Sequence, residues 1–118
     1  MSRPRILVAE DDPSVRMTLQ FVLEDEGFEV IMAEDGERAV AVARAERPDV
    51  ILLDGMLPKL DGREVYSTLR GDDATKEIPV LVLSGMVREH DDWPGAHFVG
   101  KPFSPDELIK QIREALPR

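Results

Sequence analysis

The stretch Asp49-Val50-Ile51-Leu52-Leu53-Asp54-Gly55-Met56-Leu57-Pro58 decides the fold of this chain. Four consecutive apolar residues lead directly into the carboxylate of Asp54, and Gly55 and Pro58 then turn the chain. A short apolar run between turn-forming residues is typical of a strand buried on both faces, as in a parallel sheet. Burying an ionised carboxylate at the end of such a strand is costly unless a partner or a metal meets it. Asp54 therefore lies either in water at the rim of the sheet or in a charged site.

Other apolar runs repeat this design, and several of them also end at polar residues. We predict further strands at Arg5–Ala9, Phe28–Ala33, Pro79–Ser84 and Ala96–Val99. The first of these runs into Glu10-Asp11-Asp12, and the last leads to Gly100 and Lys101. Carboxylate, hydroxyl and ammonium groups thus follow apolar strands at four separate places in the chain.

Apolar residues at helical spacing predict a helix after each of four strands, with turn-forming residues at the boundaries. The first helix starts at Asp12 or Ser14 and stops at Gly27, because Asp and Ser cap helix starts and Gly favours helix ends. The expected starts and stops of the others are Asp35-Gly36 to before Pro48, Asp61-Gly62 to before Gly71, and about Ser104 to Leu116. We interpret 71–76 as a polar surface loop.

Strands that alternate with helices imply right-handed crossovers and a parallel sheet covered on both faces. Five such units suit a doubly wound α/β sheet of order 2-1-3-4-5, in which ligands bind beyond the carboxyl ends of the strands. That order places Glu10 and Asp11 beside Asp54, and it brings Ser84 and Lys101 to the same edge. The alternation therefore predicts one site that collects residues from distant parts of the chain.

Three carboxylates at one edge repel one another, and a hard divalent cation relieves that repulsion. Mg²⁺ keeps several waters, takes one or two carboxylates and also accepts phosphate oxygens. Lys101 and Ser84 can pair with other phosphoryl oxygens. These residues predict Asp54 as the nucleophile of a phosphoryl transfer that depends on Mg²⁺.

Composition narrows the classes of function. At 118 residues the chain is expected to be one domain, residues 1–118. Its 15 basic and 24 acidic residues give a net charge of −9, which disfavours direct nucleic-acid binding. The absence of cysteine excludes disulfides, thiolate catalysis and zinc–thiolate sites. The first apolar run is too short for a signal peptide or a membrane span, so a soluble cytoplasmic protein is expected.

Over essentially its full length, the chain resembles a receiver domain of the two-component response regulators. The acidic opening Glu10-Asp11-Asp12-Pro13, the segment Asp54–Pro58 with Asp61-Gly62, the run Pro79–Gly85 and the triplet Lys101-Pro102-Phe103 carry the resemblance. Family members share the flavodoxin-like sheet order 2-1-3-4-5. The resemblance implies a stand-alone, single-domain receiver.

The resemblance also implies a role for each matching residue. Asp54 would accept a phosphoryl group from a histidine kinase or a phosphotransfer protein. The Mg²⁺ ligands would be Asp11, Asp54 and the main-chain carbonyl of Met56, with Glu10 acting through water. Ser84 and Lys101 would hold the phosphoryl group, and Phe98 would be the aromatic residue that changes rotamer as Ser84 is drawn inward. The only enzymatic activity expected is self-phosphorylation and autodephosphorylation, and the output is binding to a downstream protein or phosphate relay.

The segment between the fourth and fifth strands departs from the family pattern. Only twelve residues separate Ser84 from His97, close to the minimum for a parallel crossover that contains a helix. We predict a shortened or irregular fourth helix there, with Trp93 covering the core that a longer helix would have sealed.

Two other classes of function compete with a phosphorylated switch. A phosphatase of the haloacid dehalogenase type also uses an Asp at a strand end, but it needs a second Asp two residues later, where this chain has Met56. A pseudo-receiver would bind partners without phosphorylation. The intact set of acidic residues, hydroxyl and lysine argues against it, whereas the short crossover keeps it open.

Overall fold

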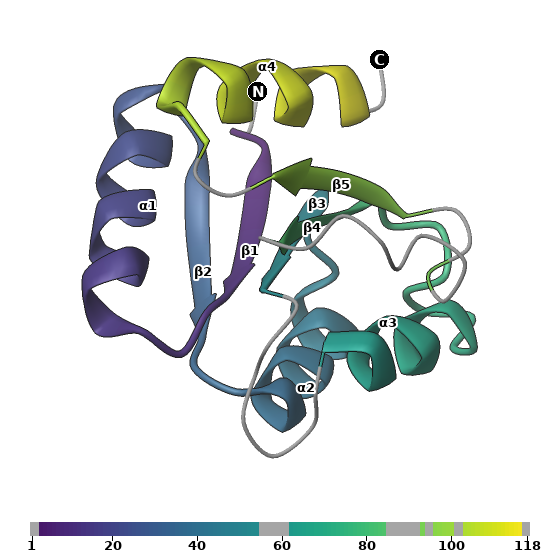
Figure 1. The fold of residues 1–118 in the computed structure, drawn as a ribbon. Helices are drawn as coiled ribbons and strands as arrows, with labels where there is room; N and C mark the ends of the chain where they lie inside the picture. Colours follow the sequence, from purple (N-terminus) through teal and green to yellow (C-terminus); the bar gives the residue numbers. More distant parts are fainter. Residues whose placement is uncertain (1–2, 55–61, 85–92, 94–95, 101–102, 117–118) are drawn as a thin grey trace.

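The computed structural model describes residues 3–54, 62–84, 93, 96–100 and 103–116, with only the backbone for Ser84. Strands and helices alternate along most of the described chain (Figure 1). The strands are β1 (Arg5–Ala9), β2 (Glu29–Ala33), β3 (Val50–Asp54), β4 (Val80–Ser84) and β5 (His97–Gly100). The helices are α1 (Pro13–Asp25), α2 (Gly36–Glu46), α3 (Gly62–Arg70) and α4 (Pro105–Ala115). No helix in the described ranges is long and apolar enough to cross a membrane.

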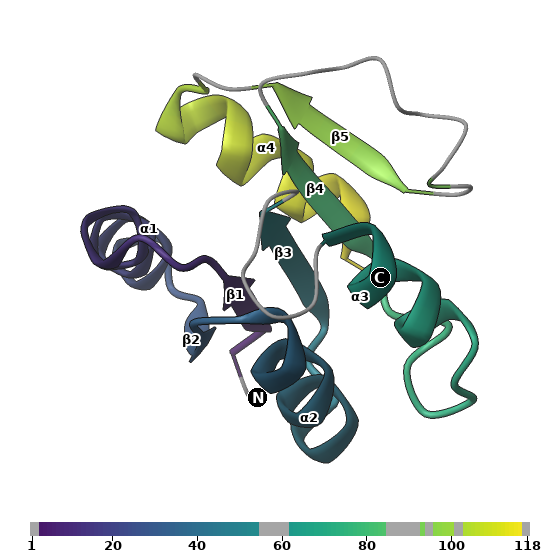
Figure 2. The same cartoon turned by 60° about the horizontal axis from the view of Figure 1, so that its bottom comes forward.

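All five strands form one parallel sheet in the order β2-β1-β3-β4-β5, as predicted. Helices α2 and α3 lie side by side on one face of the sheet, and α1 and α4 cover the other (Figures 1 and 2). The central strand β3 is buried along its whole length, which is the environment that its unbroken apolar sequence predicts.

Each face of the sheet has its own hydrophobic core, because successive side chains of a strand point to opposite faces. In β3, Ile51 and Leu53 join the core under α2 and α3, whereas Val50 and Leu52 join the core under α1 and α4. Asp54 continues the alternation of the second pair. The alternation thus directs Asp54 to the side of α1 at the carboxyl edge of the sheet.

The helix boundaries follow local chemistry. Asp12 caps α1: its carboxylate accepts hydrogen bonds from the N–H groups of Ser14 and Val15 at 2.8 and 3.4 Å. Of the two predicted caps, Asp12 is therefore the one in use. Gly27 stands beyond the end of α1 with a φ of 93°, a backbone conformation that favours glycine. At the end of α2, Arg47 adopts a left-handed conformation with a φ of 45°, which the sequence did not indicate.

A cluster of ion pairs around Arg5 lies at the amino end of β1, opposite the end of the sheet that carries Glu10 and Asp54. Its guanidinium donates hydrogen bonds to the carboxylates of Glu46 and Glu29, and its main-chain N–H donates to Asp49 at 2.8 Å. The hydrogen bond to Glu46, and then that to Glu29, raise the pKa of Arg5. A raised pKa keeps Arg5 charged up to strongly alkaline pH, so its own titration changes stability only there.

The crossover from β4 to β5 is only partly described. The predicted shortened fourth helix falls mainly on residues 85–92 and 94–95, which lie outside the described residues. Trp93 itself is buried with 4% of its surface exposed, in the core under α2 and α3. Its burial agrees with the predicted covering of that core.

The loop predicted as polar and surface-exposed contains one buried residue. Thr75 is fully buried, and its hydroxyl donates a hydrogen bond to the carbonyl of Leu69 at 2.7 Å. The polar composition of the loop predicted full solvation, but this buried hydroxyl joins the loop to the end of α3.

We predict that Thr75→Val lowers the free energy of unfolding by about 1–2 kcal/mol, because it removes the donor to a buried carbonyl without changing side-chain size. Urea unfolding followed by circular dichroism measures the difference. Thr68→Val, the same change at an exposed position of α3, is the matched control and should shift stability by less than about 0.5 kcal/mol. Equal effects of the two changes would contradict the prediction.

Candidate functional site

The loop between β1 and α1 is tightly held at the carboxyl edge of the sheet. The main-chain N–H of Glu10 donates to the carbonyl of Ala33 on β2 at 3.0 Å. The carboxylate of Glu10 accepts a hydrogen bond from the N–H of Asp12 at 3.2 Å. The side chain of Glu10 is buried, with 2% of the residue exposed, whereas Asp11 is exposed.

Asp54 reaches the same place from β3. In the register of the sheet, Ala9 pairs with Leu53, so Glu10 and Asp54 are the next residues along the two strands. Asp54 is buried with 6% of its surface exposed. It is therefore the charged floor of a site, and the alternative of a carboxylate in water at the rim is wrong.

Glu10, Asp11 and Asp54 converge as predicted. Each offers a carboxylate oxygen, and these oxygens all lie within 4.8 Å of one another. We call these three residues the acidic cluster. Opposite oxygen ligands of one Mg²⁺ stand about 4.2 Å apart, so the cluster has the size of a single-ion site with space for water. Hard oxygen donors of this kind suit Mg²⁺ or Ca²⁺ and do not suit soft metals.

Arg16 belongs to this site although the sequence analysis did not select it. Its Nη1 donates to the carbonyl oxygens of Glu10 and Asp11 at 2.9 and 3.0 Å. A cation near the start of a helix faces the positive end of the helix dipole, which is unfavourable. A basic residue in the first turns of the predicted helix was thus the sequence signal that could have identified Arg16.

The other predicted site residues are placed less completely. The backbone of Ser84 ends β4 and pairs with Gly100, the residue before Lys101. This register places the carboxyl ends of β4 and β5 side by side, which supports the prediction that Ser84 and Lys101 come to the same edge of the sheet. Lys101 and Met56 lie outside the described residues.

Phe98, the predicted switch residue, belongs to an aromatic row. Its ring meets Trp93 edge-on at 5.8 Å between centroids, and Trp93 in turn meets Tyr66 of α3 at 5.7 Å. Arg70 stacks on the Tyr66 ring at 5.0 Å and donates a hydrogen bond to its hydroxyl at 3.1 Å. These contacts connect Phe98 to a buried tryptophan and to helix α3.

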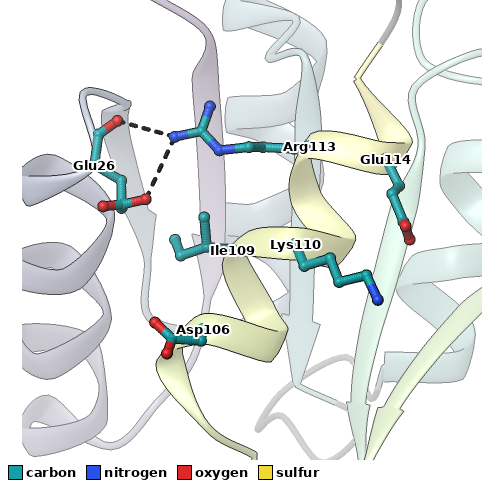
Figure 3. Close-up of a pocket in the computed structure, with 6 residues that line it drawn as sticks. All are labelled: Glu26, Asp106, Ile109, Lys110, Arg113 and Glu114. Carbon is teal, nitrogen blue, oxygen red and sulfur yellow. Dashed lines mark hydrogen bonds and ion pairs between the residues drawn. The ribbon is translucent and has the colours of Figure 1, made fainter.

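A groove of about 540 Å³ lies elsewhere, between the end of α1 and α4 (Figure 3). Arg113 crosses it from α4 to the carboxylate and carbonyl of Glu26, both at 3.4 Å. It is lined by Glu26, Asp106, Ile109, Lys110, Arg113 and Glu114. None of the predicted site residues that the structure describes lines this groove, so it is separate from the acidic cluster.

Comparison with known proteins agrees with the fold. The model of the response regulator receiver domain family matches residues 6–113. The alkaline phosphatase synthesis transcriptional regulatory protein PhoP of Bacillus subtilis is 41% identical over 97% of this chain and 49% of its own length. A putative response regulator from Chloroflexus aurantiacus has a TM-score of 0.92 at 30% identity, covering 99% of this chain and 100% of that one.

A third similar protein bears on the metal. The receiver domain of a sensor histidine kinase from Pseudomonas aeruginosa is described with a magnesium ion coordinated in its active site cleft. It has a TM-score of 0.89 at 26% identity and covers 96% of this chain and 97% of that one.

These matches define the class of protein as a receiver domain of two-component signalling. The chain belongs to the response regulator receiver domain family. It spans about half the length of the curated relatives that it matches.

We predict that Asp11→Asn stabilises the metal-free protein by about 1 kcal/mol, because it removes one of three like charges held within 4.8 Å. Urea unfolding in the presence of a chelator measures this. Asp73→Asn is the matched control, since the Asp73 side chain is 95% exposed, and it should change stability by less than about 0.5 kcal/mol. A less stable Asp11→Asn protein would contradict repulsion within the acidic cluster.

Proposed function

We propose that this receiver domain accepts a phosphoryl group on Asp54 in a reaction that depends on Mg²⁺. In its phosphorylated form, the domain binds a different protein or passes the phosphoryl group on. The convergence of Glu10, Asp11 and Asp54 within 4.8 Å at the carboxyl edge of the sheet carries this proposal. Membership of the receiver family supports it.

The donor set fits Mg²⁺. Asp11 and Asp54 would bind it directly together with the main-chain carbonyl of Met56, and Glu10 would act through water. When bound, the ion supplies positive charge that offsets the acidic cluster and the negative charge of the incoming phosphoryl group. The burial of Glu10 and Asp54 strengthens these interactions, because charges interact more strongly away from water.

The chemical step is a displacement at phosphorus. An oxygen of Asp54 forms a bond to phosphorus as the bond from phosphorus to the donor's histidine nitrogen breaks, and the departing imidazole keeps the bond's electron pair. Hydrolysis of the resulting acyl phosphate returns the carboxylate and releases inorganic phosphate. We propose self-phosphorylation and autodephosphorylation as the only catalysed reactions.

The switch follows from the new charge on Asp54. Ser84 and Lys101 would move toward the phosphoryl oxygens, and Phe98 would occupy the space that Ser84 leaves. The edge-on contact between Phe98 and Trp93 supports this route, since a rotating Phe98 ring must change its packing on a buried neighbour.

The proposed partners are proteins of the cytoplasm. A histidine kinase or phosphotransfer protein would supply the phosphoryl group, and a downstream protein would recognise the result. The net charge of −9 supports protein partners over nucleic acid or an anionic membrane surface for this domain. PhoP of Bacillus subtilis is named a transcriptional regulatory protein, but this chain aligns with only 49% of its length.

We predict that a small phosphoryl donor such as acetyl phosphate, together with Mg²⁺, adds one phosphoryl group to the intact protein. Asp54→Asn should abolish the addition because it removes the nucleophile, and Asp11→Asn should slow it by about tenfold or more because it removes a metal ligand. Mass spectrometry measures both effects. Asp73→Asn, an exposed acidic residue remote in sequence from the cluster, should behave as the unchanged protein.

The same experiment separates the alternatives. A protein that stays unmodified with donor and Mg²⁺ would favour the pseudo-receiver. Continuous release of phosphate from an added phosphate ester would favour the phosphatase.

We also predict that phosphorylation changes the fluorescence of Trp93, the chain's one tryptophan, because Phe98 packs against it at 5.8 Å. Phe98→Leu should reduce the fluorescence change while the added mass stays the same. Phe21→Leu is the matched control, since Phe21 is 73% exposed on α1. An undiminished fluorescence change in Phe98→Leu would exclude Phe98 as the route.

A further inference from the structure

One side chain, that of Arg16, holds the main chain of the acidic loop. The Nη1 of Arg16 donates to the carbonyls of Glu10 and Asp11 at 2.9 and 3.0 Å, and its main-chain N–H donates to the carbonyl of Asp12 at 2.9 Å. Three consecutive carbonyls therefore bind the same residue. Two of these three residues belong to the acidic cluster.

These hydrogen bonds constrain the backbone from which the side chains of Glu10 and Asp11 project. The carbonyls of Glu10 and Asp11 belong to the two peptide groups on either side of Asp11, so holding both restricts its two backbone dihedrals. The direction in which the Asp11 carboxylate leaves the backbone is then set. At Glu10, the N–H bound to Ala33 and the carbonyl bound to Arg16 hold the residue from both ends.

Arginine is suited to this contact because its planar guanidinium presents donors in fixed directions. A lysine keeps the charge but is a single, flexible ammonium group without that geometry. Charge and geometry have opposite effects on the site. A nearby positive charge repels a cation, whereas a loop fixed in the binding geometry favours it.

We propose that Arg16 is a positioning residue, which orients the carboxylates of Glu10 and Asp11 for a divalent cation by holding the main chain on both sides of Asp11. This inference rests on the proposed function, since it concerns the same Mg²⁺ site. The gain in Mg²⁺ affinity from a fixed loop is larger than the loss from the nearby positive charge of Arg16.

The chain offers a matched control in Arg70. Nη1 of Arg70 also donates to two main-chain carbonyls, those of Lys76 and of Ile78, the latter at 3.1 Å. These carbonyls precede β4, at the edge of the sheet opposite the acidic cluster. Arg70→Lys thus removes the same kind of contact without touching the site.

The test is the dissociation constant for Mg²⁺, measured by isothermal titration calorimetry on the full chain without a phosphoryl donor. Arg16→Lys and Arg16→Met should both weaken binding by about tenfold, the usual effect of losing a residue that orients metal ligands. Arg70→Lys should leave the dissociation constant unchanged, even if it lowers the urea midpoint. Phosphorylation of Arg16→Lys should need about tenfold more Mg²⁺ but reach the same rate at saturation.

The outcomes distinguish this inference from the proposed function. If both Arg16 variants bind Mg²⁺ as tightly as the wild-type protein or more tightly, the positioning role is overturned. If only Arg16→Met binds Mg²⁺ more tightly, the charge of Arg16 has the larger effect, which also overturns the inference. If Arg16→Met fails to fold, Arg16→Lys decides the question, because it keeps the charge. No Mg²⁺ binding by the unchanged protein would overturn the proposed function and this inference with it.

Discussion

Mutual repulsion within the acidic cluster is the constraint on which the site depends. Two carboxylates, those of Glu10 and Asp54, are almost fully buried, and a third, Asp11, stands within 4.8 Å of both at the oxygen atoms. Such an arrangement opposes folding, because like charges repel and burial removes the water that would screen them. Packing elsewhere in the domain contributes free energy that keeps these groups together.

The sheet supplies it through burial on both faces. β3 is fully buried, and the cores under α2 and α3 and under α1 and α4 fix its position relative to β1. The register that pairs Ala9 with Leu53 then places the next residues, Glu10 and Asp54, side by side. Strain at the carboxyl edge is thus offset by packing elsewhere, which is how a folded domain holds a site ready for a cation.

Two sets of contacts lead away from the acidic cluster, and they have different roles. Arg16 fixes the main chain of the loop, so it acts on the geometry of metal binding. The aromatic row from Phe98 through Trp93 to Tyr66 joins β5 to α3, so it connects the proposed switch residue with a helix on the same face of the sheet. The groove beside α4 belongs to neither set.

Local sequence patterns determined much of this protein. The five strands, the four helices described and the sheet order followed from apolar runs, helical spacing and caps such as Asp12 and Ser104. The acidic cluster also followed, because parallel strands bring their carboxyl ends to one edge. The metal-binding role of Met56 came from the family resemblance alone, and the roles of Ser84, Lys101 and Met56 remain predictions.

Only the tertiary structure showed which polar side chains stabilise the fold through hydrogen bonds to the main chain. Thr75 is fully buried although its surroundings in sequence are polar, and Arg16 binds three carbonyls although it looks like a surface cation. The physical reason is that hydrogen bonds to main-chain carbonyls depend on where the backbone passes in space. Apolar periodicity records which face of an element is buried, but it carries no information about which carbonyl a long or small polar side chain will meet.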